Sequence, residues 1–187
     1  MSEFRFTDGN LIILYAQFRP HSSDAGALPE YIIRRIQTCI ETYTMVVKSK
    51  PDANKSMVVL VADANMVEPI KRMLASGGID EKIVAADTES QSVGQAIENV
   101  HSIIQSKPNP PFIYFIASYW LQDVFNSTVI SKLKGIKVQF YGSLDQRPLQ
   151  EIEADRAADA PKKGTEYYKR KAQNRAVDML LNVIFPD

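Results

Sequence analysis

Residues 57–69 read MVVLVADANMVEP, and this stretch decides the fold class. Its continuous apolar run is typical of a strand that is covered on both faces. The run ends at Ala62, and a pattern of helical period begins directly afterwards. Asp63 and Asn65 therefore occupy a strand-to-helix turn. Asp and Asn are favoured helix N-caps, and such turns also bind ligands in α/β proteins, so both roles are open for this pair.

The same change from strand to helix recurs along the chain. Short apolar runs predict five strands, at residues 11–18, 57–62, 82–85, 112–117 and 136–141. Segments of helical period lie between them, at residues 28–47, 66–75, 93–104 and 120–133. Repeated strand–helix–strand units predict an α/β protein with a three-layer, Rossmann-like fold and a mainly parallel sheet of about five strands.

Length and composition predict a single domain over residues 1–187. The chain is 45% hydrophobic, which is enough for one substantial core. Its 22 basic and 22 acidic residues cancel, so no global field favours nucleic acid or an anionic membrane. No apolar window reaches the roughly 18 residues of a membrane helix, and no secretory signal is recognisable, so we expect a cytoplasmic protein. One cysteine, Cys39, and two distant histidines, His21 and His101, give no metal-site spacing.

The sequence changes character after the fifth expected strand. Residues 145–164 are rich in charge and alanine and contain Pro148 and Pro161, which predicts a polar excursion. Residues 165–185 predict a C-terminal amphipathic helix that packs back on the sheet. Its basic face is interpreted as a solvated helix surface. Its apolar face consists of Ala172, Ala176, Met179, Leu180, Val183 and Ile184.

The turns that follow the strands contain the candidate binding residues. Parallel sheets bind ligands at the carboxyl ends of their strands, where the N-termini of the following helices also point. No glycine-rich loop follows any expected strand, so the dinucleotide and P-loop fingerprints are absent, and no particular cofactor is implied. We expect an anionic or nucleotide-like small molecule, held by Gln17, Arg19, Arg35, Asp63, Asn65, Ser90 and Ser118.

Each of these residues also has a structural interpretation. Arg19 could be a solvated loop residue, and Arg35 could form an internal ion pair with Asp63 or Glu68. The sole tryptophan, Trp120, could stack on a ring of the ligand or pack in the core or an interface. The possible helix N-caps are Asp63 or Asn65, Ser90 or Ser92, and Ser118.

Catalysis is open, and the chain offers one acid–base candidate at the expected cleft. His21 lies in the loop after the first strand and could titrate near neutrality. Asp63 would then be its orienting or metal-binding carboxylate. Cys39 falls on the apolar stripe of the first helix, which argues against a nucleophilic role, and no G-x-S-x-G motif occurs.

Several landmarks occur in an order that resembles a known family. Residues 35–43, RIQTCIETY, fit the pattern R-[IL]-x-x-[AC]-[IL]-x-x-Y, and residues 117–120, ASYW, end the fourth expected strand with a serine and an aromatic residue. Between them lie Glu68 at a helix start, Gly78 before an isoleucine, and Ser90 after a glutamate. Over about residues 11–142 the chain thereby resembles the family of domains of unknown function that includes the SanA, YdcF and ElyC-like proteins.

This resemblance implies a Rossmann-like fold with a ligand cleft at the strand carboxyl ends. In some members it implies envelope metabolism or nucleotide-type ligands, and many members carry a membrane segment that is not found in this sequence. The family's S-G-G after the second strand is replaced here by residues 62–64, ADA, its threonine and asparagine after the third strand by Val93 and Ala96, and its histidine and arginine after the fourth by Leu121 and Val124. These replacements favour an alternative, in which the cleft is degenerate. The domain would then be an interaction or homo-oligomerisation module that uses an apolar surface near Trp120 and the C-terminal helix.

Overall fold

Strands and helices alternate throughout the part of the chain that the structure describes. This structure, a computed structural model, describes residues 9–17, 28–49, 56–104 and 112–159. The strands are β1 (Asn10–Tyr15), β2 (Ser56–Val61), β3 (Val84–Asp87), β4 (Phe112–Ser118) and β5 (Val138–Ser143). The helices are α1 (Glu30–Ser49), α2 (Ala64–Ser76), α3 (Val93–Ile104), α4 (Gln122–Lys132) and α5 (Leu149–Asp159). Two short 3-10 helices, η2 (Glu81–Ile83) and η3 (Tyr119–Leu121), precede β3 and α4.

The five described strands form one parallel sheet in the order β3-β2-β1-β4-β5. β1 is central, and Leu14 pairs with Leu60 on one side and with Ile116 on the other. Every residue of β1 and β2 is buried, as continuous apolar runs predict. The predicted Rossmann-like α/β fold is confirmed. Because the chain crosses from β3 to the far side of β1, the topological switch point lies between β1 and β4.

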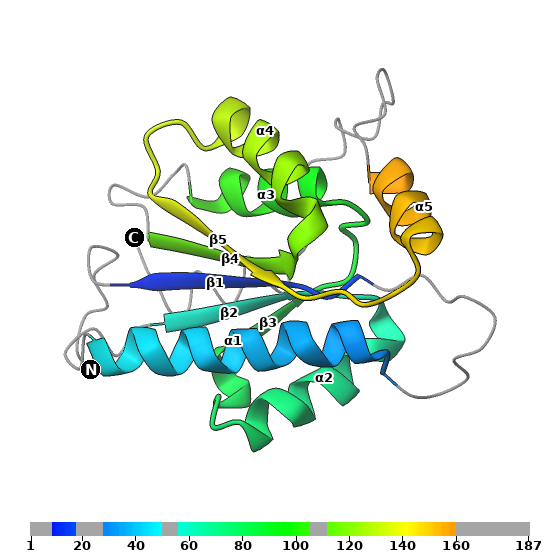
Figure 1. Cartoon of the computed structure of the whole chain (residues 1–187). Helices are drawn as coiled ribbons and strands as arrows, with labels where there is room; N and C mark the ends of the chain where they lie inside the picture. The colour runs from blue at the N-terminus through cyan, green and yellow to red at the C-terminus, as the bar shows by residue number, and fades with distance from the viewer. Residues whose placement is uncertain (1–8, 18–27, 50–55, 105–111, 160–187) are drawn as a thin grey trace.

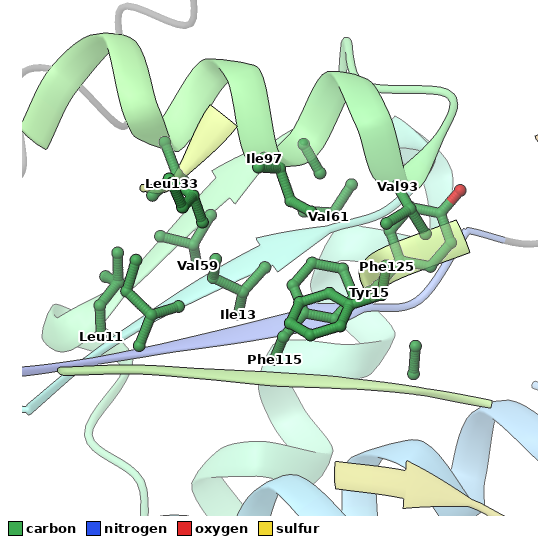
Figure 2. Close-up of a cluster of buried hydrophobic side chains, with 14 of the residues drawn as sticks. Leu11, Ile13, Tyr15, Val59, Val61, Val93, Ile97, Phe115, Phe125 and Leu133 are labelled. Carbon is green, nitrogen blue, oxygen red and sulfur yellow. The ribbon is translucent and has the colours of Figure 1, made fainter. Parts of the chain in front are cut away.

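Helices cover both faces of the sheet, with α1 and α2 on one face and α3 and α4 on the other (Figure 1). Alternate residues of β1 enter the two cores, because successive strand side chains point to opposite faces. Ile12 and Leu14 pack in the α1 and α2 core. Leu11, Ile13 and Tyr15 pack in the α3 and α4 core, which Figure 2 shows.

A glycine cap ends α2. Gly78 has a φ of 88°, and its N–H donates to the Ala75 carbonyl at 2.9 Å, while the Ile79 N–H donates to the Leu74 carbonyl at 3.1 Å. This pattern is the Schellman motif, which satisfies carbonyls at the end of a helix. At Gly77, a Cβ atom would overlap the side chain of Ile40. The pair thus both ends α2 and lets it approach α1.

Two segments differ from the prediction. The polar excursion at residues 145–164 contains α5, which follows Pro148; its carbonyl accepts from the N–H groups of Glu151 and Ile152. Alanine, glutamate and arginine are good helix formers, so this helix needs no apolar stripe. The strand expected at 82–85 begins instead at Val84, because the Asp80 side chain accepts the Lys82 N–H at 2.9 Å and starts η2.

Two further sequence predictions concern membranes and the C-terminus. None of the helices in the described ranges is long and apolar enough to cross a bilayer. The C-terminal helix expected at residues 165–185 lies outside the described residues.

Candidate functional site

The candidate site lies at the carboxyl edge of the sheet. The carboxyl ends of all five described strands lie there because the sheet is parallel, and α1 begins at this edge (Figure 1). Two groups of polar side chains occupy it. The first surrounds Arg35 and Asp145 at the switch point, and the second surrounds Asp87 at the end of β3.

Arg35 joins the ends of β1 and β4 from the second turn of α1. It is 1% exposed, and its Nε and Nη2 donate to Ser118 Oγ at 3.0 and 2.7 Å, while Nη1 donates to the Tyr15 carbonyl at 3.0 Å. Burial lowers the pKa of Arg35, and the fields of Tyr31 and Asp145 oppose this shift. The arginine and serine predicted for the site are therefore in direct contact.

Asp145 supplies the carboxylate of this first group. Its Oδ2 accepts from Ser118 Oγ at 3.0 Å, Trp120 Nε1 at 2.9 Å and Arg147 Nη2 at 2.9 Å. Its Oδ1 accepts from Arg147 Nε at 3.0 Å. Burial acts to raise the pKa of Asp145, but hydrogen bonds from Arg147 and Trp120 outweigh it and lower the pKa to about 2. The switch point thus holds an ionised carboxylate whose side chain is 2% exposed.

Arg147 completes the first group by contacting the loop after β5, helix α5 and helix α1. Besides Asp145, its Nη1 contacts Asp155 Oδ2 of α5 at 2.7 Å, and its guanidinium lies 3.8 Å from the ring centroid of Tyr31 in α1. Burial acts to lower the pKa of Arg147, but hydrogen bonds from both carboxylates raise it overall. Arg35 lies over the same ring, at 5.1 Å. Tyr31 therefore contacts both guanidinium groups.

The Tyr31 hydroxyl is the unsatisfied atom of this group. It is buried, and it has no hydrogen-bond partner among the described residues. Burial raises the pKa of Tyr31 to about 12, although Arg147 and Arg35 act to lower it. Since buried hydroxyls are nearly always paired, this atom leaves hydrogen-bonding capacity at the edge of the site.

The second group is centred on Asp87. Asp87 Oδ2 accepts from Ser90 Oγ at 2.6 Å and from Asn99 Nδ2 at 3.0 Å, and its Oδ1 accepts the Ser90 N–H at 3.0 Å. Gln17 Nε2 donates to the Ser90 carbonyl at 2.6 Å. Gln17 and Ser90, both predicted for the site, are therefore neighbours. Their contacts order the turn between β3 and α3.

The helix-cap interpretations have mixed outcomes. Ser92 caps α3, because its Oγ accepts the Gln95 N–H at 3.2 Å. Asp63 takes the N-cap position of α2, but its side chain makes no cap hydrogen bond there. Asn65 is exposed in the first turn of α2. Ser118 and Ser90 use their hydroxyls in the two groups described above.

Arg19 and His21 lie outside the described residues, so their predicted roles stay predictions. The carboxylate beside Arg35 is Asp145, whereas the sequence suggested Asp63 or Glu68 as an ion-pair partner. Glu68 is exposed on α2.

Sequence reasoning missed the residues that complete both groups. Asp145 follows β5 by two residues, so a search of the residues directly after each strand would have found it if the search had been extended past Ser143. Asp87 lies in an expected turn, and it would have been found as an acid followed by an N-cap serine. Tyr31 and Arg147 carry no local signal, because tertiary packing brings them together.

The chemistry of the first group suits anions. One hydroxyl, one indole N–H and the Arg147 guanidinium donate to the Asp145 carboxylate, and the Arg35 guanidinium donates to the same hydroxyl. In the described part of the chain, no group of three or more His, Cys, Asp or Glu side chains could hold a metal ion. Comparisons of the chain with protein-family models, with curated proteins and with solved structures found no match.

Proposed function

We propose that this domain binds a small anionic molecule at the carboxyl edge of its sheet, beside the switch point between β1 and β4. The observation that supports the proposal is the set of buried and half-buried donors around the Asp145 carboxylate. Ser118 and Trp120 lie at the end of β4 and donate to it, and Arg35 lies behind Ser118. A carboxylate or phosphate group needs donors of this kind, and charge-assisted hydrogen bonds to guanidinium are among the strongest.

The sequence predicts an anionic or nucleotide-like ligand, and we propose this ligand class for the site. We also propose that the protein is cytoplasmic, as the sequence predicts. As part of the same proposal, the domain is related to the SanA, YdcF and ElyC-like proteins. Leu121 and Val124, which stand where those proteins have polar residues, pack in the α3 and α4 core. The anion-binding groups of this chain would then come from Arg35, Ser118 and Trp120. Arg147, in the loop between β5 and α5, would add a further guanidinium.

A second candidate function is an interaction or self-association module. It is favoured by three large apolar side chains that are exposed at or near the same edge. Tyr119, Leu144 and Leu149 are 65%, 66% and 68% exposed. They lie in η3, directly after β5, and at the start of α5. Exposed apolar clusters often mark protein contacts.

A thermal-shift screen separates the two candidates. The purified chain is heated with nucleotides, sugar phosphates and dicarboxylates, each against sodium chloride at equal ionic strength. Binding of a ligand at 100 times its Kd stabilises the folded state by about 2.7 kcal/mol, so the melting temperature of the parent should rise. Ser118→Ala, which removes one donor, should lose most of this rise.

Leu144→Ser is the matched control for the screen. It changes the exposed apolar side chains and leaves the donors in place, so it should keep the ligand-induced rise. Three results together would favour self-association over anion binding. No anion would raise the melting temperature, the parent's mass in sedimentation would grow with concentration, and Leu144→Ser would stay monomeric.

A further inference from the structure

Asp145 differs from two of its donors, Ser118 and Trp120, in the kind of backbone that carries it. Ser118 ends β4, and Trp120 lies in η3. Asp145, in contrast, belongs to the connection between β5, which ends at Ser143, and α5, which begins at Leu149. Ser118 and Trp120 are thus held by the sheet and its immediate continuation, whereas Asp145 and its third donor, Arg147, lie in a short loop.

The loop is held in place through Arg147. This residue contacts Asp145 in the loop, Asp155 in α5 and the Tyr31 ring in α1. If the loop moved away, Arg35 would remain at the buried edge without its neighbouring carboxylate. A buried charge without compensation is strongly unfavourable, so an open loop would require another anion in place of Asp145.

Tyr31 gives a second, independent indication of a ligand. Its hydroxyl is buried and unpartnered among the described residues, although its ring lies beneath both guanidinium groups. The Asp145 carboxylate leaves this hydroxyl unsatisfied. A ligand with an additional oxygen atom could both replace the carboxylate and accept the Tyr31 hydrogen bond.

We infer that Asp145 is a built-in occupant of the anion site, and that a free carboxylate-bearing molecule binds by displacing it from Ser118 and Trp120. This inference rests on the proposed function and adds its regulation, because the loop between β5 and α5 competes with the ligand. A site that is closed about nine-tenths of the time binds about tenfold more weakly than an open one. Removal of the Asp145 carboxylate should therefore strengthen the binding of a free anion.

Asp145→Ala tests the displacement by leaving a space of the size of a carboxylate, with formate as the probe. The variant should melt below the parent, and formate should recover part of the loss where chloride at equal ionic strength does not. Asp155→Ala is the matched control, because it also removes a carboxylate that contacts Arg147 but leaves Ser118 and Trp120 paired. Formate should give no specific recovery in that variant.

Trp120 fluorescence gives a second readout. It is the only tryptophan of the chain, and its indole N–H donates to Asp145. In Asp145→Ala its emission should differ from the parent, and formate should move the emission back. Formate should also bind Asp145→Ala at least about tenfold more tightly than it binds the parent. Phosphate in parallel titrations shows whether the site accepts any oxyanion.

The outcomes separate this inference from the proposed function. If Asp145→Ala folds and responds equally to formate and chloride, the carboxylate is only structural and the inference is overturned. An anion that stabilises the parent and Asp145→Ala equally, and changes Trp120 emission to the same extent in both, overturns displacement of Asp145 but leaves the proposed anion site intact. If no anion stabilises either protein, both fail. Should Asp145→Ala not fold, Asp145→Asn, which keeps the shape but removes the charge, should bind formate more tightly than the parent does, and equal affinities would overturn the inference.

Discussion

At the residue scale, the carboxyl edge depends on charges that are buried together. Arg35 and Arg147 both contact the Tyr31 ring, and Asp145 accepts hydrogen bonds from Arg147 and from Ser118, the residue to which Arg35 donates. Such groups contribute little when complete but cost much when one partner is removed. The adjacent residues Arg34 and Arg35 on α1 should therefore differ greatly in their contribution to the free energy of unfolding, which a pair of alanine variants can measure.

Arg35→Ala should lower the free energy of unfolding by about 3–5 kcal/mol, because it leaves Ser118 and the Tyr15 carbonyl without their buried donor. Arg34→Ala is the control. Arg34 pairs with Glu30 one turn away in an exposed position, and such pairs contribute at most about 0.5 kcal/mol. Urea unfolding measures both variants. Equal losses would contradict the assignment of Arg35 as the buried link between β1 and β4.

Tyr31→Phe should leave the free energy of unfolding within about 0.5 kcal/mol of the parent, because the hydroxyl that it removes has no partner in the described chain. The ring that contacts both guanidinium groups remains. If the hydroxyl serves a ligand, the same variant should weaken anion binding, as measured by calorimetry. A large loss of stability would show that the hydroxyl has a structural partner.

The residues of the site were only partly predictable from the sequence. Arg35 and Ser118 were found because each lies near a strand end, where a local rule applies. Their direct contact was not predicted, since 83 residues separate them and only the strand order brings β1 beside β4. Asp145 and Tyr31 depend in the same way on long-range packing.

At the element scale, the close approach of β5 and η3 positions Trp120 beside Asp145. Gly142 permits this approach, because a Cβ atom there would lie 2.5 Å from the Tyr119 ring and 3.1 Å from its Cα. Gly142→Ala should therefore cost about 1–3 kcal/mol through overpacking and alter Trp120 emission.

Gly94→Ala is the control for that substitution. Gly94 lies in the first turn of α3, and its Cβ would meet only Ser92 Oγ among atoms within 4 Å, at 3.8 Å. Alanine should be neutral or stabilise the protein by up to about 1 kcal/mol at this position. Thermal unfolding compares the two variants. The steric account fails if Gly142→Ala is as stable as Gly94→Ala.

The elements themselves were more predictable than the site. Four helices and five strands follow from hydrophobic period, because burial on one stripe or on both faces leaves a local pattern. α5 was missed because it is mostly exposed and its composition resembles that of a loop. β3 was shifted because Asp80 redirects the backbone into η2 before the strand begins.

At the scale of the whole molecule, Asp145 links stability to pH. Its folded-state pKa of about 2 lies below the ordinary value of 3.8, so its ionised form favours the folded state above about pH 4. This contribution, about 2 kcal/mol, should be lost as the pH falls from 4 to 2. Asp145→Asn should show a smaller loss over the same range. Urea unfolding at several pH values would reject the linkage if the parent and the variant had the same slope.

The most direct test of an anion site at this edge is a titration of the parent chain followed by Trp120 emission. The ligand is the most stabilising anion from the thermal screen, and chloride at equal ionic strength is the blank. We predict a saturable change in emission that Ser118→Ala greatly weakens, because both residues donate to the same carboxylate position. A ligand that binds by calorimetry without changing Trp120 emission would contradict the claim and place binding elsewhere on the molecule.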